Sequence, residues 1–273
     1  MNYEDYQSSK EAIKFLVRSR DTIQESRKAI DNRVGRKANG EAQNVNHNLT
    51  DEDTVLFVAE AVEYRKHEKS CEKILGDVLK RFPIWNEWLK NIKGVGPISA
   101  GWIIAEFDIY KADTVSKLWQ FSGMNPGMVI GKRRIENADG SFSFELSNEL
   151  VRGDKLTKGF CAPFNKRLRA ALLGVMAKGF MMSKNEYYLK YYLTYKDRLI
   201  NSENMIEENS GNGKKIITTW KDSKPLHRDS AAKRYMVKMF LADLYAIWRP
   251  LHNLQVRPPY QQEKLGHIHR IAV

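Results

Sequence analysis

Two long stretches near the start of the chain carry apolar residues at helical spacing among many charges. The first covers residues 3–34, and the second begins at Thr50 and continues to about residue 81. Thr50 is a good N-terminal cap, and the acidic residues that follow it suit the positive end of a helix. Neither helix buries its apolar stripe alone, so we expect the two to pair as an antiparallel hairpin or coiled coil. The polar residues 36–48 between them are expected to form a turn or loop.

Shorter elements are predicted for the rest of the chain. A β-hairpin is expected from strands at residues 128–135 and 141–146, and a further short strand at residues 216–220. The predicted helices cover residues 84–92, 98–107, 114–121, 163–182, 186–200 and 230–254. The sequence therefore predicts a mainly α protein with two domains. Residues 1–82 would form the helical hairpin, and residues 83–273 a helical domain with a helix-hairpin-helix and a small β-hairpin.

The strongest local motif is a two-glycine bend between two apolar helices, LKNIKGVGPISAGWI at residues 89–103. Its glycines allow backbone conformations closed to residues with a Cβ atom, and they bring N–H groups to the surface. The free N–H groups at the start of the second helix suit a phosphate, and such contacts hold a nucleic acid without reading its sequence. The residues predicted to contact nucleic acid at the bend are Lys93, Gly94, Val95, Gly96 and Ser99. The alternative is a turn that packs two helices together and binds nothing.

The net charge of +12 is confined to one part of the chain. Residues 1–92 contain sixteen Lys/Arg and sixteen Asp/Glu, whereas residues 93–273 contain twenty-nine against seventeen. A field of this kind attracts anionic polymers, and each phosphate that it neutralises releases counterions. The clustered cations predicted to contact nucleic acid are Lys132, Arg133, Arg134, Lys166, Arg167, Arg169, Arg228, Lys233, Arg234 and Lys238. For any single cluster, the alternative is a solvated basic face without a ligand.

Helical spacing adds two expectations about these regions. Arg234 and Lys238 are four positions apart in the last predicted helix, so they should share a face. Five tyrosines fall in the helix predicted at residues 186–200, where they could stack on bases, although their spacing favours packing in the core. They are Tyr187, Tyr188, Tyr191, Tyr192 and Tyr195.

Residues suited to catalysis or metal binding are few. Glu106, Asp108 and Asp113 follow the bend, but carboxylates so close to a helix end cap or solvate it more often than they bind a metal. His267 and His269 have metal-ligand spacing, yet no Cys or carboxylate set completes a site. The sequence therefore predicts no catalytic residue, no metal site and no cofactor. No apolar run is long enough for a membrane helix, and the two cysteines fit small buried hydrophobes, so we expect a cytoplasmic protein.

Four stretches in this order resemble a known family. They are GVGPISA at residues 94–100, LWQFSGMNP at 118–126, NKRLRAAL at 165–172 and the closing helix at 232–248. The part of the chain from Leu89 to the end thereby resembles the C-terminal domain of bridge-RNA-guided insertion-sequence transposases, which also carry a RuvC-like N-terminal DEDD domain. Two departures stand out. The family's catalytic serine would fall within residues 127–130, where this sequence has no hydroxyl, and the DEDD domain is missing, so we expect no recombinase activity.

A helical hairpin followed by this helical domain also looks like the Nop fold of box C/D guide-RNA proteins and of the TIGR-Tas proteins of prokaryotes and their viruses. TIGR-Tas proteins are RNA-guided DNA-targeting proteins, some with a RuvC or HNH nuclease and some without, and this chain is similar to the nuclease-free kind. The resemblance implies that the basic domain grips guide RNA by shape and backbone, while base pairing reads the target DNA. It also implies a homodimer formed by the N-terminal helices, room for a separate nuclease partner, and a mobile-element or phage setting.

The leading hypothesis is an RNA-guided DNA-binding protein without a nuclease of its own. One alternative is a transposase or recombinase, or its DNA-binding accessory subunit. The other is a structural DNA-binding protein that uses no guide RNA.

Overall fold

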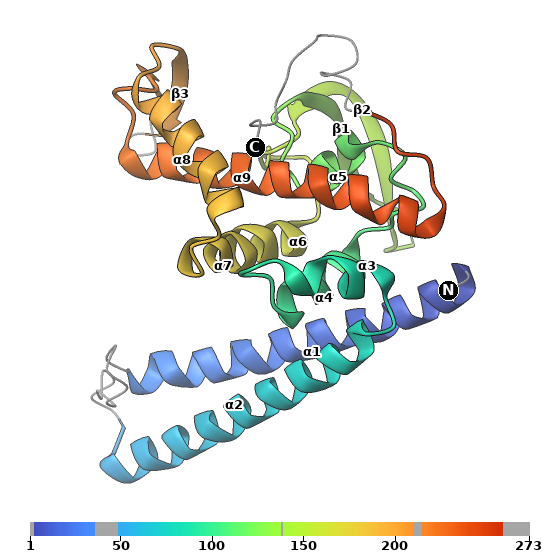
Figure 1. Cartoon of the computed structure of the whole chain (residues 1–273). Helices are drawn as coiled ribbons and strands as arrows, with labels where there is room; N and C mark the ends of the chain where they lie inside the picture. The colour runs from blue at the N-terminus through green and yellow to red at the C-terminus, as the bar shows by residue number, and fades with distance from the viewer. Residues whose placement is uncertain (1–2, 36–48, 138, 210–214, 259–273) are drawn as a thin grey trace. The chain divides into compact units, whose positions relative to one another are not determined.

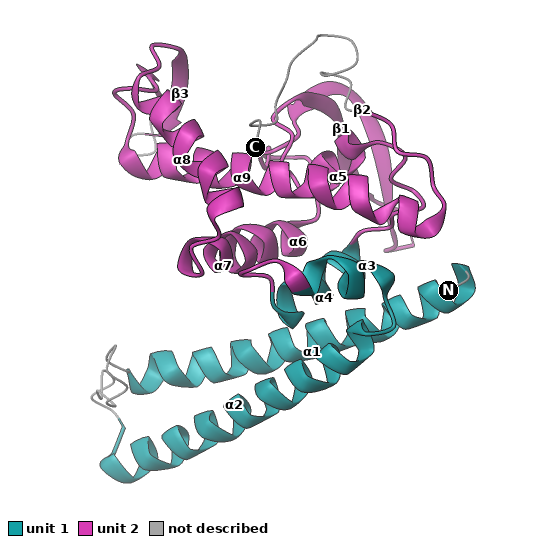
Figure 2. Cartoon of the chain, in the orientation of Figure 1, with its two compact units in different colours: residues 1–90, 96–106 teal, residues 91–95, 107–273 magenta. Residues whose placement is uncertain are grey.

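A computed structural model of the protein describes residues 3–35, 49–137, 139–209 and 215–258. The structure is mainly helical, with 61% helix and small antiparallel sheets, which confirms the predicted fold class. The chain divides into two compact units (Figure 2). Unit 1 comprises residues 1–90 and 96–106, and unit 2 comprises residues 91–95 and 107–273. This division differs from the predicted boundary between residues 82 and 83, because the short helices that follow it cluster with the helical hairpin.

Unit 1 is built on the two long helices that the sequence predicts, α1 (Tyr3–Val34) and α2 (Asp51–Leu79) (Figure 1). Thr50 caps α2 as expected. Its hydroxyl accepts a hydrogen bond from the backbone N–H of Asp53 at 3.1 Å, and the Asp53 carboxylate accepts one from the N–H of Thr50 at 3.3 Å. This reciprocal capping box fixes the start of the helix. The loop predicted at residues 36–48 lies outside the described residues.

Ion pairs between α1 and α2 show that the helices are antiparallel. Arg20 pairs with Glu72 at 3.2 Å, and Asp31, further along α1, pairs with Arg65, earlier in α2, at 2.9 Å. Between these pairs, the buried Glu68 accepts hydrogen bonds from arginines of α1. A buried carboxylate requires such partners, so these pairs resist sliding of one helix along the other.

A close contact at Gly101 attaches the second helix of the two-glycine bend to the helical hairpin. This helix, α4 (Pro97–Glu106), packs on both α1 and α2. A Cβ atom at Gly101 would lie 2.7 Å from Val17 and 2.9 Å from Leu75, so only glycine allows this approach. The remaining helical turns between α2 and the bend are α3 (Pro83–Glu87) and the 3-10 turn η1 (Leu89–Asn91).

Unit 2 is organised around a long C-terminal helix, α9 (Pro225–Trp248). Helices α5 and α8 pack against it, and its inner face is fully buried at Phe240 and Trp248. It begins five residues earlier than predicted, because Pro225 is well suited to the first turn of a helix. The other helices of unit 2 are α5 (Val115–Phe121), α6 (Lys166–Ala171), the π-helical turn η2 (Leu172–Met176), α7 (Ala177–Met182), α8 (Glu186–Ile200) and the 3-10 turn η3 (Pro250–His252).

Two antiparallel β-hairpins complete unit 2. The predicted hairpin forms from β1 (Met128–Glu136) and β2 (Phe142–Arg152), and both strands are longer than expected. A second hairpin pairs β3 (Met205–Asn209) with β4 (Lys215–Thr219), in a segment where the sequence predicts only one short strand. No helix in the described ranges combines the length and apolar character needed to cross a membrane.

Candidate nucleic-acid interface

The two-glycine bend is partly occupied by packing within unit 2. Gly94 has φ +96°, and a Cβ atom there would lie 2.7 Å from the backbone carbonyl of Gly179 in α7. The carbonyl of Lys93 accepts a hydrogen bond from the side-chain amide of Asn185 at 2.8 Å. Gly94 is therefore required for a backbone-to-backbone contact, and packing alone explains this glycine without any ligand.

The remaining residues of the bend differ in what they can offer to a ligand. Lys93 is exposed, and the space where a Cβ atom of Gly96 would lie is open. Val95 is buried, which counts against its prediction as a contact residue and fits a side chain that fills the core between the two helices. Ser99 is only 5% exposed, which corrects its prediction as a contact residue: its side chain points into the protein. Gly94 has a positive φ, whereas Gly96 does not, so only the first glycine adopts a conformation that disfavours residues with a Cβ atom.

The β1–β2 hairpin separates the three cations predicted at residues 132–134. Successive side chains of a strand point to opposite faces, so Lys132 and Arg134 share one face and Arg133 lies on the other. The register places Lys132 opposite Leu146 and Arg134 opposite Phe144. The outer face of the hairpin, defined here as the face with Lys132 and Arg134, therefore combines cations with exposed apolar side chains. Those side chains are Met128, Ile130, Phe142, Phe144, Leu146 and Leu150.

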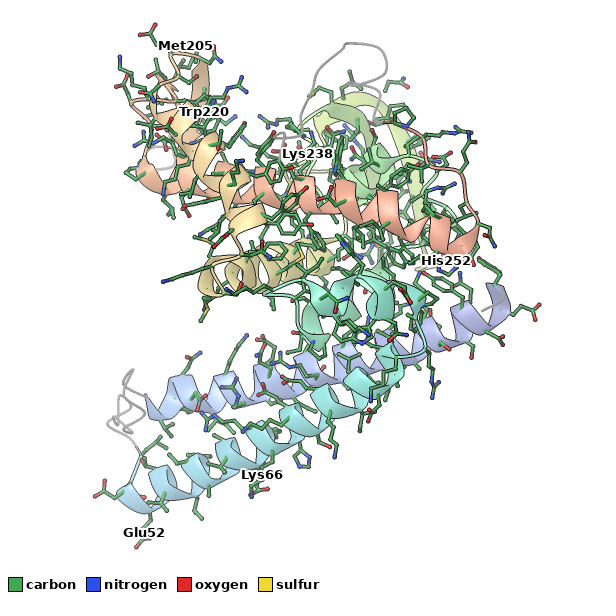
Figure 3. The ribbon with its side chains drawn as sticks, in the orientation of Figure 1. Glu52, Lys66, Met205, Trp220, Lys238 and His252 are labelled. Carbon is green, nitrogen blue, oxygen red and sulfur yellow. The ribbon has the colours of Figure 1, made fainter. Side chains whose placement is uncertain are left out.

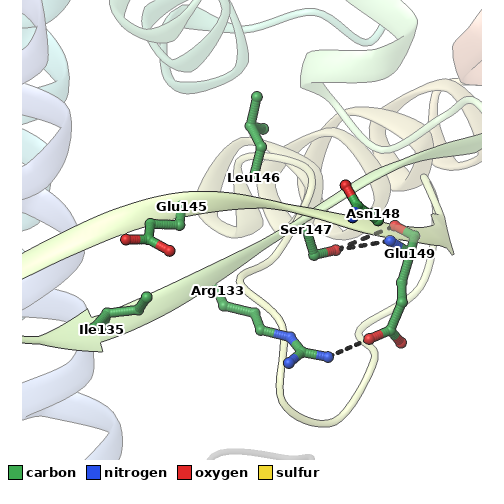
Figure 4. Close-up of a pocket in the computed structure, with 7 residues that line it drawn as sticks. All are labelled: Arg133, Ile135, Glu145, Leu146, Ser147, Asn148 and Glu149. Atoms are coloured by element: carbon green, nitrogen blue, oxygen red, sulfur yellow. Dashed lines mark hydrogen bonds and ion pairs between the residues drawn. The ribbon is translucent and has the colours of Figure 1, made fainter.

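Arg133, on the opposite face, forms an ion pair with Glu149 across an irregular stretch of β2 (Figure 4). In the same view Leu146 points to the other side of the hairpin. These residues line a groove of about 400 Å³ that also contains Glu145. With one arginine and two carboxylates, the groove does not suit a phosphate. Arg133 therefore does not belong to the basic surface that contains Lys132 and Arg134.

The start of α6 continues the basic surface of the hairpin. The backbone N–H of Cys161 donates to the carbonyl of Lys132 at 2.7 Å, and Asn165 then caps α6. Lys166 and Arg167 follow, and both are exposed. Five residues span at most about 18 Å, so the backbone of Lys166 lies within about 20 Å of the β1 backbone. In the described part of the chain, none of Lys132, Arg134, Lys166 and Arg167 is paired with a carboxylate.

Two of the predicted cations instead hold the fold together. One guanidinium nitrogen of Arg169 donates to the carbonyls of Gly123 at 2.7 Å and Asp154 at 2.8 Å. One nitrogen of Arg228 donates to three carbonyls in the segment from residue 220 to residue 223. Burial lowers the pKa of Arg169, although the group remains charged at neutral pH. Both arginines are better explained by the loops they fix than by contact with a ligand.

The cations of α9 divide in a similar way. Lys233 pairs with Asp229 at 2.7 Å, one turn earlier in the same helix. Arg234 and Lys238 line one cavity of unit 2, as their four-residue spacing predicts. Burial lowers the pKa of both side chains. Lys238 lies over the ring of Trp119, with its Nζ 4.2 Å from the ring centre.

The tyrosine band of α8 belongs mainly to the core. Tyr188, Tyr191 and Tyr192 are buried, and burial raises the pKa of Tyr188. Tyr195 is half-buried and stacks on Tyr235 of α9, with the ring centres 4.4 Å apart. Only the tyrosines of α8 that reach the surface could stack on a base.

The three carboxylates near the bend each have a basic side chain close by. Glu106 pairs with Arg18, Asp108 lies 3.8 Å from Lys111, and Asp113 pairs with Lys117. Among the described residues, no three His, Cys, Asp or Glu side chains are grouped so that they could hold a metal ion. His267 and His269 lie outside the described residues.

Some residues of the interface were not predicted from the sequence. Phe142 and Phe144 are exposed beside Lys132 and Arg134, and the alternation of Phe142, Phe144 and Leu146 in the predicted strand is the signal that could have indicated them. Arg134 lies over the ring of Phe142 at 3.4 Å. Aromatic rings beside unpaired cations are a common arrangement at surfaces that bind single-stranded nucleic acid.

Comparisons with known proteins do not assign the chain to a family. No protein-family model matches the sequence, and neither a curated protein nor a solved structure is significantly similar to it.

Proposed function

We propose that unit 2 binds a nucleic-acid strand by its phosphodiester backbone, along the outer face of the β1–β2 hairpin and the start of α6. The observation that carries this proposal is the set of four exposed cations without carboxylate partners in the described residues: Lys132, Arg134, Lys166 and Arg167. Exposed rings lie beside Arg134, and the exposed Leu146 lies opposite Lys132. A solvated basic face explains the charge, but not the apolar side chains that share its surface.

The side chains on this surface suit a single strand. Phe142 and Phe144 can stack on bases of any sequence, and the cations can neutralise phosphates. Contacts of both kinds position a strand without reading its bases.

The more specific form of the proposal is an RNA-guided DNA-binding protein without its own nuclease, in the cytoplasm of a prokaryotic cell. It is supported by the resemblance of the sequence to nuclease-free TIGR-Tas proteins. It is also supported by a surface suited to holding a strand without reading its bases. In such a protein, base pairing between guide and target supplies the specificity, so the protein needs only to hold the backbone of the guide.

Sequencing the RNA that copurifies with the protein from cells carrying its native locus tests this form. We expect one discrete class of small RNA, and we expect ribonuclease treatment to abolish sequence-specific DNA binding. Recovery of no discrete RNA would contradict the guided form. Equal binding to unrelated duplexes, unaffected by ribonuclease, would instead support a structural DNA-binding protein.

We also propose that the helical hairpin of unit 1 forms a homodimer through α2. Val55 and Leu56 are both 68% exposed, and Val62, one heptad after Val55, is also exposed. Large apolar side chains at heptad spacing on an exposed helix favour pairing with another helix.

Sedimentation equilibrium measures this association directly. The protomer mass is 31.6 kDa, so the dimer should sediment at about 63 kDa. Val55→Glu with Val62→Glu should return the mass to that of one protomer, because two charges cannot be buried without partners. His67→Glu with Ser70→Glu, which adds the same two charges at exposed positions of α2 and leaves the apolar residues intact, is the control. A wild-type chain of single-protomer mass at micromolar concentration would contradict the dimer.

A further inference from the structure

A cavity of about 200 Å³ lies in unit 2 between the first half of α9, the end of α8 and the segments that flank the β1–β2 hairpin. At about 30 Å³ per water molecule, this volume equals roughly seven waters, enough for a small polar group with part of what it is attached to. Lys238 and Trp220, which both line it, are labelled in Figure 3. The full lining is Met124, Pro126, Arg152, Asp154, Tyr195, Trp220, Ala231, Arg234, Tyr235 and Lys238.

The charges of this lining do not balance. Arg152 forms two hydrogen bonds with Asp154, at 2.9 and 3.1 Å, so these two groups neutralise each other. Arg234 and Lys238 are left without a carboxylate partner in the described part of the chain. The lining therefore has a formal charge of +2.

Two cations without an ion-pair partner in one partly buried cavity are costly to keep. Burial opposes the charged form of each and lowers the pKa of both Arg234 and Lys238, and the charge of Asp154 offsets this only in part for Arg234. The charge of Arg234 contributes to the lowered pKa of Arg169, which shows that these two cations are close. Arg169 therefore adds a further positive charge near the cavity. A bound anion would offset this cost.

We propose that this cavity binds a phosphomonoester, with Arg234 and Lys238 holding the phosphate and the aromatic wall holding the nucleoside attached to it. A phosphomonoester carries a charge of about −1.5 to −2 at neutral pH, which matches the lining better than the single negative charge of a backbone phosphodiester. The guanidinium of Arg234 can bind two phosphate oxygens at once, and Lys238 supplies a point charge. Trp220 and Tyr195 offer rings for stacking or edge contact with a base.

The other groove in unit 2, beside Arg133, does not share these properties. Its arginine is paired with Glu149, and Glu145 makes its lining net negative. A phosphate is therefore expected in the cavity at α9 and not in that groove. The proposal does not depend on the binding of a strand by the hairpin and α6, because it uses none of the same residues.

Isothermal titration calorimetry with matched probes tests the cavity. The probes are a 5′-phosphorylated trinucleotide RNA, the same trinucleotide with a 5′-hydroxyl, and adenosine 5′-monophosphate. We expect the phosphorylated trinucleotide to bind at least roughly tenfold more tightly than its hydroxyl counterpart, as expected for charged hydrogen bonds to phosphate. Similar affinity for adenosine 5′-monophosphate would identify a free nucleotide as the ligand, and weaker affinity would identify the end of a strand.

Variants locate the binding. Arg234→Gln and Lys238→Gln should each weaken binding of the phosphorylated probe by roughly tenfold or more, whereas Lys178→Gln, which removes an exposed charge of α7, should not. Lys238→Arg keeps the charge and should retain most of the affinity. If Arg234→Gln fails to fold, the comparison of Lys238→Gln with Lys238→Arg still tests the proposal. So does the preference of the wild-type chain for the phosphorylated probe. Equal binding of the phosphorylated and hydroxyl probes, or full affinity in Lys238→Gln, would overturn the proposal.

Discussion

Replacing Lys132, Arg134, Lys166 and Arg167 by glutamine is expected to weaken binding of a single-stranded RNA of about 20 nucleotides by roughly a hundredfold. Each exposed contact between a cation and a phosphate contributes about 0.5 to 1 kcal/mol near 0.1 M salt, so four contacts contribute about 2 to 4 kcal/mol. The four side chains make no ion pair in the described residues and lose only the contact of Arg134 with the Phe142 ring, so the free energy of unfolding should fall by no more than about 1 kcal/mol. Fluorescence anisotropy with a labelled RNA measures the affinity, and circular dichroism checks the fold.

A matched variant in unit 1 separates this effect from the loss of net charge. Lys28, Lys66, Lys69 and Lys73 are all exposed on α1 and α2. Changing these four to glutamine lowers the net charge by the same amount but removes no predicted contact. We expect the affinity to fall less than about threefold. An equal loss in the two variants would mean that binding is a property of overall charge and not of the hairpin and α6.

Gly94→Ala is expected to lower the free energy of unfolding by about 3 kcal/mol. The positive φ of Gly94 costs a residue with a Cβ about 1 kcal/mol, and the overlap with the backbone of Gly179 adds about 1 to 3 kcal/mol. The overlap is with backbone atoms, which cannot turn aside as a flexible side chain can. Urea unfolding followed by circular dichroism gives this difference.

Gly96→Ala is the control, because it lies in the same bend without either constraint. A Cβ there meets nothing within 4 Å, and φ is outside the left-handed region. We expect a change of less than about 1 kcal/mol, in the stabilising direction, since alanine restricts the unfolded chain. Equal destabilisation by both substitutions would show that the Gly94–Gly179 contact does not explain this motif.

The fold could be predicted from the sequence where the signal is local. The long apolar periodicity predicts α1 and α2, and Thr50 with Asp53 predicts the start of α2. The break within residues 163–182, where a π-helical turn separates α6 from α7, has no comparable local signal. The start of α6 does have a local signal, because its N-cap residue is Asn165 and asparagine is favoured at that position.

The candidate interface depends on contacts between distant residues, so less of it could be predicted. Lys132, Arg133 and Arg134 form one cluster in sequence, but the strand places Arg133 on the other face, beside Glu149. Arg169 and Lys166 are in the same helix, yet Arg169 holds carbonyls from two other segments. Likewise, nothing near Gly94 in the sequence indicates that Gly179 packs against it. Charge clusters identify the basic unit, whereas only tertiary structure separates the cations that hold the fold from those that face solvent.

The dependence of RNA affinity on salt concentration tests most directly whether exposed cations of unit 2 grip a phosphodiester backbone. For a single strand, the slope of log affinity against log salt is about −0.7 for each phosphate that the protein neutralises. We predict a steep negative slope for the wild-type chain, and a slope shallower by about 3 when Lys132, Arg134, Lys166 and Arg167 are changed to glutamine. An affinity that does not change with salt, or a slope that is the same in this variant as in the wild-type chain, would contradict the account.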